Sequence, residues 1–451
     1  ALTPQMEKRL KAVFGEYIAF WHSKVSKVKK QKILQKLKEG SIRILAGARS
    51  ALFLPIDKLG IIIVDEEHDD AYKSNAAPRL NARDVALFLA KKQGIKILLG
   101  SATPSLNIYY KALQSKNVFR LKGSFYTAKK EFIFSSDSDY LHPLILENLR
   151  KSLAANKQVI IFIPTRANFK YLLCRQCGGV IQCPHCSVAM SLHKKDSALK
   201  CHYCHFVSPL LDTCPTCGYE LESLRVGTQE FSRQLVAHLP HARIACFDRD
   251  SVTTSRGLAN ILDDFNHHRI DILVGTQMLS KGHDYHNVSL SVVLGLDYLL
   301  RGGDYRSREK ALSLMFQVSG RSGRKEDGRV IIQTSQQDFF QPYLQDYEKF
   351  LKDELEIRKN LYPPFVRLGL IRIAHSDKKK AYSLMQEILK ALPFNDKVEI
   401  VGYGDAPIEK IANKYRCVIL LRSIESKALH NTLRSLQDFP CEIDIDPLDF
   451  N

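Results

Sequence analysis

The chain has 451 residues, 45% of them hydrophobic and 25% charged, which supplies enough apolar material for two to four domain cores. No run of 18 apolar residues occurs and the first residues do not form a signal peptide, so we expect a cytoplasmic protein without a transmembrane helix. The net charge of +18 favours a polyanion such as nucleic acid as partner; the alternative is a charge that only solubilises the surface.

Two short apolar segments in the first hundred residues each end in polar residues. Residues 61–64 are followed at once by Asp65-Glu66-Glu67-His68, and residues 95–99 by Gly100-Ser101-Ala102-Thr103-Pro104. A carboxylate at the carboxyl end of a strand can hold Mg²⁺, while its neighbour orients or deprotonates a water. The alternative is a pair of solvated acids at a strand end, so the first motif alone does not decide the function.

Further apolar segments of strand length lie at 159–163, 272–274 and 292–294, with helical patterns between most of them. Like the segments at 61–64 and 95–99, they are continuous and do not alternate with polar residues, which is typical of parallel strands covered on both faces. The expected fold class is therefore α/β with a doubly wound parallel sheet. The polar stretch at 135–139 predicts a linker between two such units.

Eight of the 11 cysteines form four C-x-x-C pairs: Cys174/Cys177, Cys183/Cys186, Cys201/Cys204 and Cys214/Cys217. Each pair aims two sulfurs at one point, and two pairs complete a tetrahedral thiolate shell, so the spacing predicts two structural zinc ions. Disulfides are the weaker alternative because nothing indicates a secreted protein. The spacing leaves open whether neighbouring pairs combine or the outer pairs enclose the inner ones.

Two later segments carry residues suited to phosphate chemistry. Residues 275–284 (GTQMLSKGHD) follow the strand at 272–274, and residues 317–324 (QVSGRSGR) hold Arg321 and Arg324 three positions apart. Guanidinium groups that glycines hold in this way can reach a γ-phosphate from across a cleft. The alternative is the ordinary basic start of a helix.

The C-terminal part has a different pattern. Residues 366–374 alternate like a half-buried strand, and helical spacing at 378–392 and around 426–436 separates strands at 398–401, 417–421 and 441–445. This β-α-β-β-α-β order predicts a small α+β domain of the split-βαβ type.

The motifs DEEH, GSATP, GTQMLSKGHD and QVSGRSGR, in this order, resemble those of superfamily 2 helicases. The eight-cysteine insert, residues 47–55 (GARSALFLP), 304–309 (DYRSRE) and 362–365 (YPPF) make nearly the whole chain similar to bacterial primosomal replication-restart DNA helicases. The resemblance implies RecA-like lobes and an ATP-dependent 3′→5′ helicase at stalled or branched forks. Implied cofactors are ATP, Mg²⁺ and two Zn²⁺; implied partners are forked and single-stranded DNA, single-stranded DNA-binding protein and other primosome proteins, with no membrane.

The resemblance also implies roles for individual residues. Asp65 would bind Mg²⁺ and Glu66 would activate water, and these two with Arg321 and Arg324 are the implied catalytic residues. Nucleotide contacts are implied for Asp65, Glu66, Ser101, Thr103, Gln317, Arg321 and Arg324, and DNA contacts for Thr3, Pro4, Arg49, Ser50, Thr276, Gln277, Lys281 and His283. Nested zinc pairing is implied as well: Cys174, Cys177, Cys214 and Cys217 would bind one ion, and Cys183, Cys186, Cys201 and Cys204 the other.

The resemblance further divides the chain into parts. These are the remainder of a first helicase lobe (1–130), a linker (131–140), a second lobe (141–335) with the zinc insert (173–220), and a C-terminal DNA-binding α+β domain (336–451). Because no G-x-x-x-x-G-K-[ST] occurs, we expect an N-terminally truncated chain that does not hydrolyse ATP alone. The alternative function is a DNA- and partner-binding zinc module without motor activity. An RNA helicase or a nuclease is less favoured because no second carboxylate cluster accompanies DEEH.

Overall fold

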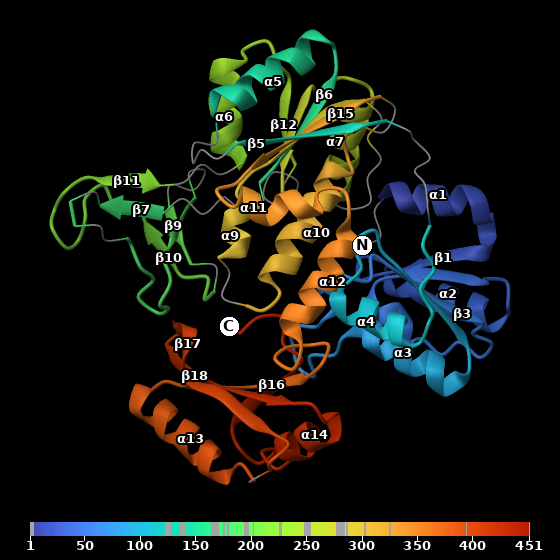
Figure 1. The fold of residues 1–451 in the computed structure, drawn as a ribbon, viewed down its shortest axis with the longest axis vertical. Helices are drawn as coiled ribbons and strands as arrows, with labels where there is room; N and C mark the ends of the chain where they lie inside the picture. The colour runs from blue at the N-terminus through green and yellow to red at the C-terminus, as the bar shows by residue number, and fades with distance from the viewer. Residues whose placement is uncertain are drawn as a thin grey trace.

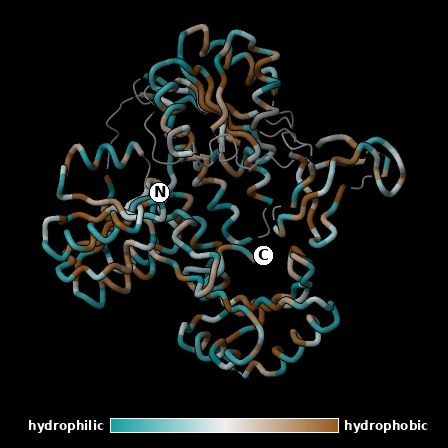
Figure 2. The backbone as a smooth tube through the Cα atoms, turned by 180° about the vertical axis from the view of Figure 1, so that it is seen from behind, coloured by the Kyte–Doolittle hydropathy of each residue, from teal (hydrophilic) through white to brown (hydrophobic). Residues whose placement is uncertain are grey.

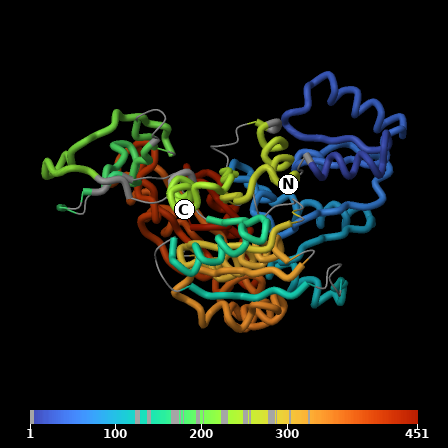
Figure 3. Tube along the Cα trace, turned by 90° about the horizontal axis from the view of Figure 1, so that it is seen from above, coloured from blue at the N-terminus to red at the C-terminus, as the bar shows by residue number. Residues whose placement is uncertain are grey.

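A computed structural model describes residues 4–121, 128–135, 141–163, 171–174, 176–177, 180–193, 198–201, 203–224, 228–247, 254–276, 285, 287–301, 304–323, 326–393 and 395–450. Two α/β units, a cysteine-rich insert and an antiparallel C-terminal domain are arranged around a group of central helices (Figure 1). The first unit and the cysteine-rich insert lie at opposite ends of the molecule when it is seen from above (Figure 3). No helix in the described segments is long and apolar enough to cross a membrane.

The first unit contains two separate pairs of parallel strands. Its elements are α1 (Pro4–Phe14), η1 (Gly15–Tyr17), β1 (Ile18–Trp21), α2 (Lys27–Lys38), β2 (Ile44–Gly47), η2 (Arg49–Phe53), β3 (Ile61–Asp65), η3 (Asp70–Tyr72), α3 (Ala82–Gln93), β4 (Lys96–Gly100) and α4 (Leu106–Gln114). Strand β1 pairs with β2, and β3 pairs with β4. Helix α3 packs Ala86 and Ala90 against Ile62 and Val64, so one face of the β3–β4 pair is buried.

The second unit is a six-stranded parallel sheet in the order β12-β13-β6-β14-β15-β5. Its strands are β5 (Lys130–Ser135), β6 (Gln158–Phe162), β12 (Ile244–Phe247), β13 (Ile272–Gly275), β14 (Val288–Val293) and β15 (Gly328–Gln333). Its helices are α5 (Pro143–Ala154), α6 (Thr228–His238), α7 (Ser255–Asn266), α9 (Leu296–Leu300) and α10 (Ser307–Ser319). Every residue of the central strand β6 is buried, because apolar clusters cover both faces of the sheet. Figure 2 shows the hydrophobic segments gathered in this sheet and in the C-terminal one.

Strand β5 corrects one expectation from the sequence. Residues 131–140 were expected to form a linker, but Lys130–Ser135 is the edge strand of the second sheet and pairs with β15 along its whole length. The three consecutive apolar residues Phe132, Ile133 and Phe134 explain the pairing, because they pack against the clusters on both faces of the sheet. Residues 136–140, the rest of the expected linker, lie outside the described segments.

The cysteine-rich insert is built from short antiparallel strands. They are β7 (Tyr171–Cys174), β8 (Ser191–His193), β9 (Ala198–Lys200), β10 (Val207–Pro209) and β11 (Leu221–Leu224). Strand β11 returns to pair with β7, and β8, β9 and β10 form a second small sheet between them in the sequence. The two ends of the insert therefore lie side by side where it joins the second unit.

Short helices connect the second unit to a four-stranded C-terminal sheet in the order β17-β18-β16-β19. The elements are α11 (Gln337–Phe340), η5 (Gln341–Tyr343), α12 (Tyr347–Arg358), β16 (Arg367–His375), α13 (Lys378–Ala391), β17 (Glu399–Ile411), β18 (Lys414–Ser423), α14 (Ser426–Arg434) and β19 (Cys441–Ile445). Helices α13 and α14 pack on one face of the sheet. The expected fold class is confirmed: parallel α/β core, zinc-type insert and C-terminal α+β domain.

Candidate nucleotide site and zinc centres

The DEEH motif stands where two parallel strands end together. Asp65 is the last residue of β3 and lies opposite Gly100, the last residue of β4. The Tyr72 hydroxyl donates a hydrogen bond to the main-chain oxygen of Asp65 at 2.6 Å, and the Asp65 carboxylate accepts the N–H of Glu66 at 3.1 Å. An exposed carboxylate at this edge of a parallel sheet can hold a divalent cation.

Glu66 of the first unit and Arg321 of the second unit each affect the pKa of the other. Burial and the neighbouring Asp65 raise the pKa of Glu66, and the Arg321 guanidinium acts against that rise. Burial also lowers the pKa of Arg321, while Tyr285 and Glu66 act to raise it. A carboxyl group with a raised pKa is suited to accept a proton near neutral pH. The arrangement therefore places a candidate base and a candidate phosphate-binding cation in one electrostatic environment.

A chain of polar side chains joins the two units beside this pair. The His68 ring lies between Ser101 and Gln317: its Nδ1 is 2.7 Å from the Ser101 hydroxyl and its Nε2 is 2.7 Å from the Gln317 amide. Gln317 also donates to the hydroxyls of Thr103 at 3.3 Å and Ser313 at 2.9 Å. Since Gln317 and Ser313 belong to α10 of the second unit, this chain connects DEEH, GSATP and QVSGRSGR directly.

Glu67 has a different role from its neighbour Glu66. Only 1% of Glu67 is exposed, and its carboxylate accepts hydrogen bonds from the Ser105 N–H at 2.6 Å and hydroxyl at 2.8 Å. Arg83 pairs with the same carboxylate at 3.1 Å. Burial raises the pKa of Glu67, while Arg83 and Ser105 act against the rise. Glu67 thus fixes the start of α4 and the loop that carries Ser101 and Thr103.

The residues expected to contact DNA are only partly described. Arg49 and Ser50 open the exposed helix η2 after β2, and Thr276 follows β13 with 9% exposure. Pro4 begins α1. Thr3, Gln277, Lys281 and His283 lie outside the described residues, as does Arg324 of the nucleotide set.

The eight cysteines of the insert come together in two groups of four. Cys174, Cys177, Cys214 and Cys217 form one group, and Cys183, Cys186, Cys201 and Cys204 form the other, with the sulfurs of each group within 4.8 Å of one another. Individual sulfur pairs lie 3.3, 3.7 and 3.6 Å apart, close to the roughly 3.8 Å expected between ligands of tetrahedral zinc with Zn–S bonds of ~2.3 Å. The two groups fit two zinc ions with complete thiolate shells.

The nested grouping follows from the strand pairing. Strand β11 runs antiparallel to β7 and places Leu221 opposite Cys174, so the last C-x-x-C pair returns to the first. Of the inner pairs, Cys183/Cys186 precedes β8 and Cys201/Cys204 lies between β9 and β10, and the two pairs meet in one group. Of the histidines in this part of the structure, His185 packs its ring edge-on against Phe206 and does not join either thiolate group.

Three family models match the chain. The Primosomal protein N C-terminal domain matches residues 358–448, the PriA DNA helicase Cys-rich region domain matches 183–209, and the Helicase conserved C-terminal domain matches 226–326. A Replication restart protein PriA from Helicobacter pylori (strain ATCC 700392 / 26695) is 47% identical over 455 residues, covering 100% of this chain and 73% of that relative. The chain belongs to the replication restart protein PriA family. The resemblance drawn from the motifs is thereby confirmed.

More distant PriA relatives and solved structures also match. The PriA of Bacillus subtilis (strain 168) is 35% identical, covering 99% of this chain and 59% of the relative. A structure of RecG bound to a three-way DNA junction covers 78% of this chain and 38% of RecG, with a TM-score of 0.42 and 15% identity. Saccharomyces cerevisiae Dbp5 bound to RNA and ADP BeF3 covers 79% of this chain and 77% of Dbp5, with a TM-score of 0.40 and 12% identity.

In this PriA-family chain, the loop after DEEH also contacts the C-terminal domain. Lys73 is 8% exposed, and its ammonium donates to the main-chain oxygens of Ile445 at 2.6 Å and Asp446 at 3.2 Å and pairs with the Asp444 carboxylate at 2.8 Å. Arg79 of the same loop pairs with Glu442. The last strand of the C-terminal domain therefore holds the loop that follows the candidate catalytic carboxylates.

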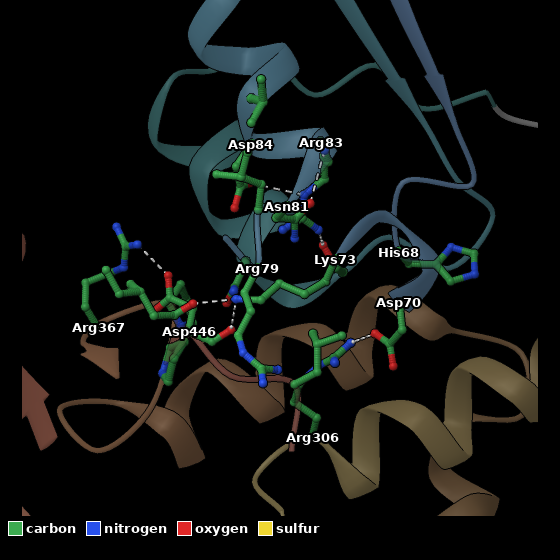
Figure 4. A pocket seen from close by; sticks show the side chains of 18 of the residues that line it. His68, Asp70, Lys73, Arg79, Asn81, Arg83, Asp84, Arg306, Arg367 and Asp446 are labelled. Atoms are coloured by element: carbon green, nitrogen blue, oxygen red, sulfur yellow. Dashed lines mark hydrogen bonds and ion pairs between the residues drawn. The ribbon is translucent and has the colours of Figure 1, made fainter. Parts of the chain in front are cut away.

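A pocket of about 510 Å³ lies at this junction, and residues of the first unit, the second unit and the C-terminal domain line it. Figure 4 shows Lys73 and Arg79 reaching toward the segment that carries Asp446, with Arg306 paired to Asp70 at 2.6 Å. Asp65, Glu66 and Arg321 are not among its lining residues. The pocket thus lies beside the hydrogen-bonded side chains that include His68, where the first unit, the second unit and the C-terminal domain meet.

The sequence signals for the residues of this site differ in strength. His68 stands inside DEEH and Ser313 stands one helical turn before Gln317, so a role for these two could have been suspected. Glu67 could not be separated from Glu66 by pattern, and the pairing of Lys73 with a residue near the other end of the chain has no local signal.

Proposed function

We propose that this chain is part of an ATP-dependent DNA helicase that translocates 3′→5′, recognises stalled or branched replication forks and promotes replication restart in the cytoplasm. The observation that carries the proposal is the contact of Gln317 with His68 and Thr103, which brings helicase motifs of both α/β units to one place. Membership in the PriA family supplies the reaction class.

In this proposal the chain's own residues divide the work. Asp65 and Glu66 stand at the end of β3, where Asp65 would hold Mg²⁺ and Glu66 would take the proton of the attacking water. Arg321 approaches from the second unit and would stabilise charge on the γ-phosphate. Ser101, Thr103 and Gln317 would transmit the position of α10 to the nucleotide. When bound, ATP would supply the free energy of translocation through its hydrolysis.

We further propose that these 451 residues do not turn over ATP by themselves. The sequence contains no G-x-x-x-x-G-K-[ST], whose backbone N–H groups and lysine cradle the β- and γ-phosphates. The test compares the chain alone with a chimera that adds the part of the Helicobacter pylori relative that this chain does not match. DNA-stimulated ATP hydrolysis is expected only from the chimera. Robust turnover by the chain alone would overturn this part of the proposal.

The direction and the substrate are tested with the same chimera. Duplexes with a 3′ or a 5′ single-stranded tail report the direction, because a 3′→5′ motor unwinds only the duplex that follows a 3′ tail. Forked DNA is compared with fully paired DNA and with matched RNA at one fixed salt concentration. Preference for RNA, or unwinding from the 5′ tail, would contradict the proposal. Single-stranded DNA-binding protein and other primosome proteins are proposed as partners, to be tested by pull-down on forked DNA.

The alternative is a DNA- and partner-binding zinc module without motor activity. It predicts that the chain binds forked DNA through the insert and the C-terminal domain, while the chimera remains without ATPase activity. Fork binding by a chimera that never hydrolyses ATP would therefore favour the alternative.

A further inference from the structure

The hairpin of β17 and β18 extends from the C-terminal sheet to the cysteine-rich insert. Its last pairs are Lys410 opposite Tyr415 and Ile411 opposite Lys414, and the two-residue turn is Ala412-Asn413. Both turn residues have positive φ, 49° and 60°. Such a turn matches the twist of a hairpin but is usually made with glycine or asparagine, so alanine is an unfavourable residue here.

The main chain at the tip of this hairpin is hydrogen-bonded to the second thiolate group, which consists of Cys183, Cys186, Cys201 and Cys204. The Asn413 N–H donates to the His185 carbonyl at 2.8 Å, and the Ser187 N–H donates to the Lys410 carbonyl at 2.8 Å. Between these two bonds, the Ala412 N–H donates to the sulfur of Cys186 at 3.1 Å. Ile411 packs against the apolar cluster that contains Cys183, Cys186 and Cys201.

The bond to Cys186 comes from an unusual direction for a zinc thiolate. Within a C-x-x-C turn, nearby backbone N–H groups surround the sulfurs, as the His185 N–H does for Cys183 at 3.4 Å. The Ala412 N–H arrives instead from a residue 226 positions away in the sequence and from another domain. A thiolate bound to zinc carries negative charge, so a donor aimed at it makes a charge-assisted hydrogen bond. The strained turn at Ala412 is what directs this donor at the sulfur.

We propose that the tip of the β17–β18 hairpin is an outer part of the second zinc site, so that the zinc ion held by Cys183, Cys186, Cys201 and Cys204 also fastens the C-terminal domain to the insert. Groups that hydrogen-bond to metal ligands orient them and strengthen metal binding. Conversely, a structural zinc site folds its own ligand loops, and the loop from Cys183 to Ser187 is the surface that the hairpin contacts.

The C-terminal domain is then held at two ends by contacts of different kinds. One end is the zinc-dependent contact of Lys410–Asn413 with the insert; the other is the pairing of Lys73 with Asp444, which involves no cysteine. Loss of the second zinc ion therefore releases the hairpin end and leaves the other end attached.

Zinc release to a coloured chelator tests the proposal in the full chain. Ala412→Pro removes the N–H, and proline cannot adopt a φ of 49°. One of the two ions is expected to leave at least about tenfold faster, the size typical for a lost outer contact, and the other at the wild-type rate. Ala412→Gly, which keeps both the N–H and the positive φ, should restore slow release.

Lys116→Pro is the matched control, because Lys116 also has a positive φ and a bonded N–H but belongs to the loop after α4. It should leave both ions at their wild-type rates. Release of both ions from Ala412→Pro at wild-type rates would overturn the proposal.

A reciprocal measurement covers the case in which Ala412→Pro fails to fold. Cys204→Ser removes one ligand of the second site, and hydrogen exchange is followed in the hairpin and in β16. Amides of residues 410–415 are expected to exchange faster than in the wild type, while those of Arg367–His375 keep their protection. Unchanged exchange at the hairpin tip after loss of the second ion would refute the link.

Discussion

Glu66 and Glu67 are neighbours in the sequence, but their carboxylates lie in different surroundings. Glu66 is partly buried just after strand β3, where the charge of Arg321 acts on its pKa. Glu67 is 1% exposed, and its carboxylate is bound by Arg83 and Ser105. The two glutamates therefore have different roles, one a candidate chemical role and one structural, because β3 ends at Asp65 and the chain turns at Glu66, which has a φ of 49°.

Substitution of Glu66 tests the proposed chemical role. In the chimera described above, Glu66→Gln should lower kcat for ATP by about 10²-fold or more, because the amide cannot accept the proton. The wild-type rate should also fall as pH decreases through the raised pKa of Glu66, at a higher pH than for an ordinary glutamate, since protonation removes the base. ATP hydrolysis measured against pH checks both points. Glu16→Gln, an exposed carboxylate in η1, is the control, and equal rates for the two variants would contradict the assignment.

Helices α4 and α12 join the first unit to the C-terminal part through one carboxylate. Glu348 of α12 accepts hydrogen bonds from the Tyr109 hydroxyl at 2.8 Å and from the Arg120 Nε at 2.8 Å. The hydrogen bond from Arg120 is the main cause that lowers the pKa of Glu348, to about 2. The contact is thus more stabilising when Glu348 is ionised than when it is protonated.

This lowered pKa predicts a pH window for stability. A depressed pKa in the folded state contributes stability above the unfolded value of ~4.3, and the contribution is lost as pH falls from there toward about 2. Glu348→Gln should therefore reduce the acid-induced loss of stability in this window. Urea unfolding between pH 5 and about pH 2.5 measures it, and a pH profile identical to that of the wild type would contradict the prediction.

The first thiolate group, formed by Cys174, Cys177, Cys214 and Cys217, gives a prediction for the zinc content and for the β7–β11 pairing. Cys214→Ser should leave one zinc ion in place of two and loosen the β7–β11 pairing, because the binding energy of a structural zinc site is folding energy. Metal analysis of the purified chain checks the count, with Cys246→Ser as a control outside both groups. Retention of two ions would refute the assignment of Cys214, and loss of both would indicate that the insert folds as one unit.

The sequence predicted the repeated local patterns well. The buried parallel strands of the second unit, the C-x-x-C turns and the β-α-β-β-α-β order each follow from spacing over a few residues, and the structure contains all three. The same expectation was wrong for β3, because Ile61 and Ile63 are 49% and 64% exposed and only one face of that strand is covered. Strand β17 is much longer than the predicted 398–401. Gly402, Gly404 and Pro407 are unfavourable in strands, so the sequence pattern predicted an early end. In the structure, β17 continues through them, and its pairing with β18 shifts register between Ile400 and Gly402 and again after Asp405. The strand at 130–135 was missed for a related reason, since its polar neighbours at 135–139 suggested a linker.

Contacts between distant parts could not be predicted in this way. The pairing of Lys73 with Asp444 and the bond from Ala412 to Cys186 depend on how four parts of the molecule pack together. No periodicity or spacing in a single sequence encodes them. The individual nucleotide and DNA contacts remain predictions for the same reason.

Lys73 gives a prediction at the scale of the whole molecule. Lys73→Met should lower the free energy of unfolding by about 3 kcal/mol, because the buried Asp444 carboxylate loses one of its two cations. This is the low end of the range for breaking a buried ion pair, since Arg372 still pairs with Asp444 at 3.1 Å. Chemical denaturation measures the change, and Lys58→Met, an exposed lysine, is the control. Equal stability of the two variants would show that the junction contributes little to the fold.

The pairing of Lys73 also has a consequence for how the protein is made. Its partner Ile445 follows 372 residues later, so a ribosome adding ~5–20 residues per second needs on the order of tens of seconds between the two. Throughout that time the partners that bind the buried Lys73 are missing, although β3 and β4 on either side of the loop are synthesised early. The loop after DEEH can therefore be anchored only after the ribosome has passed Asp446, long after Lys73 itself has been synthesised.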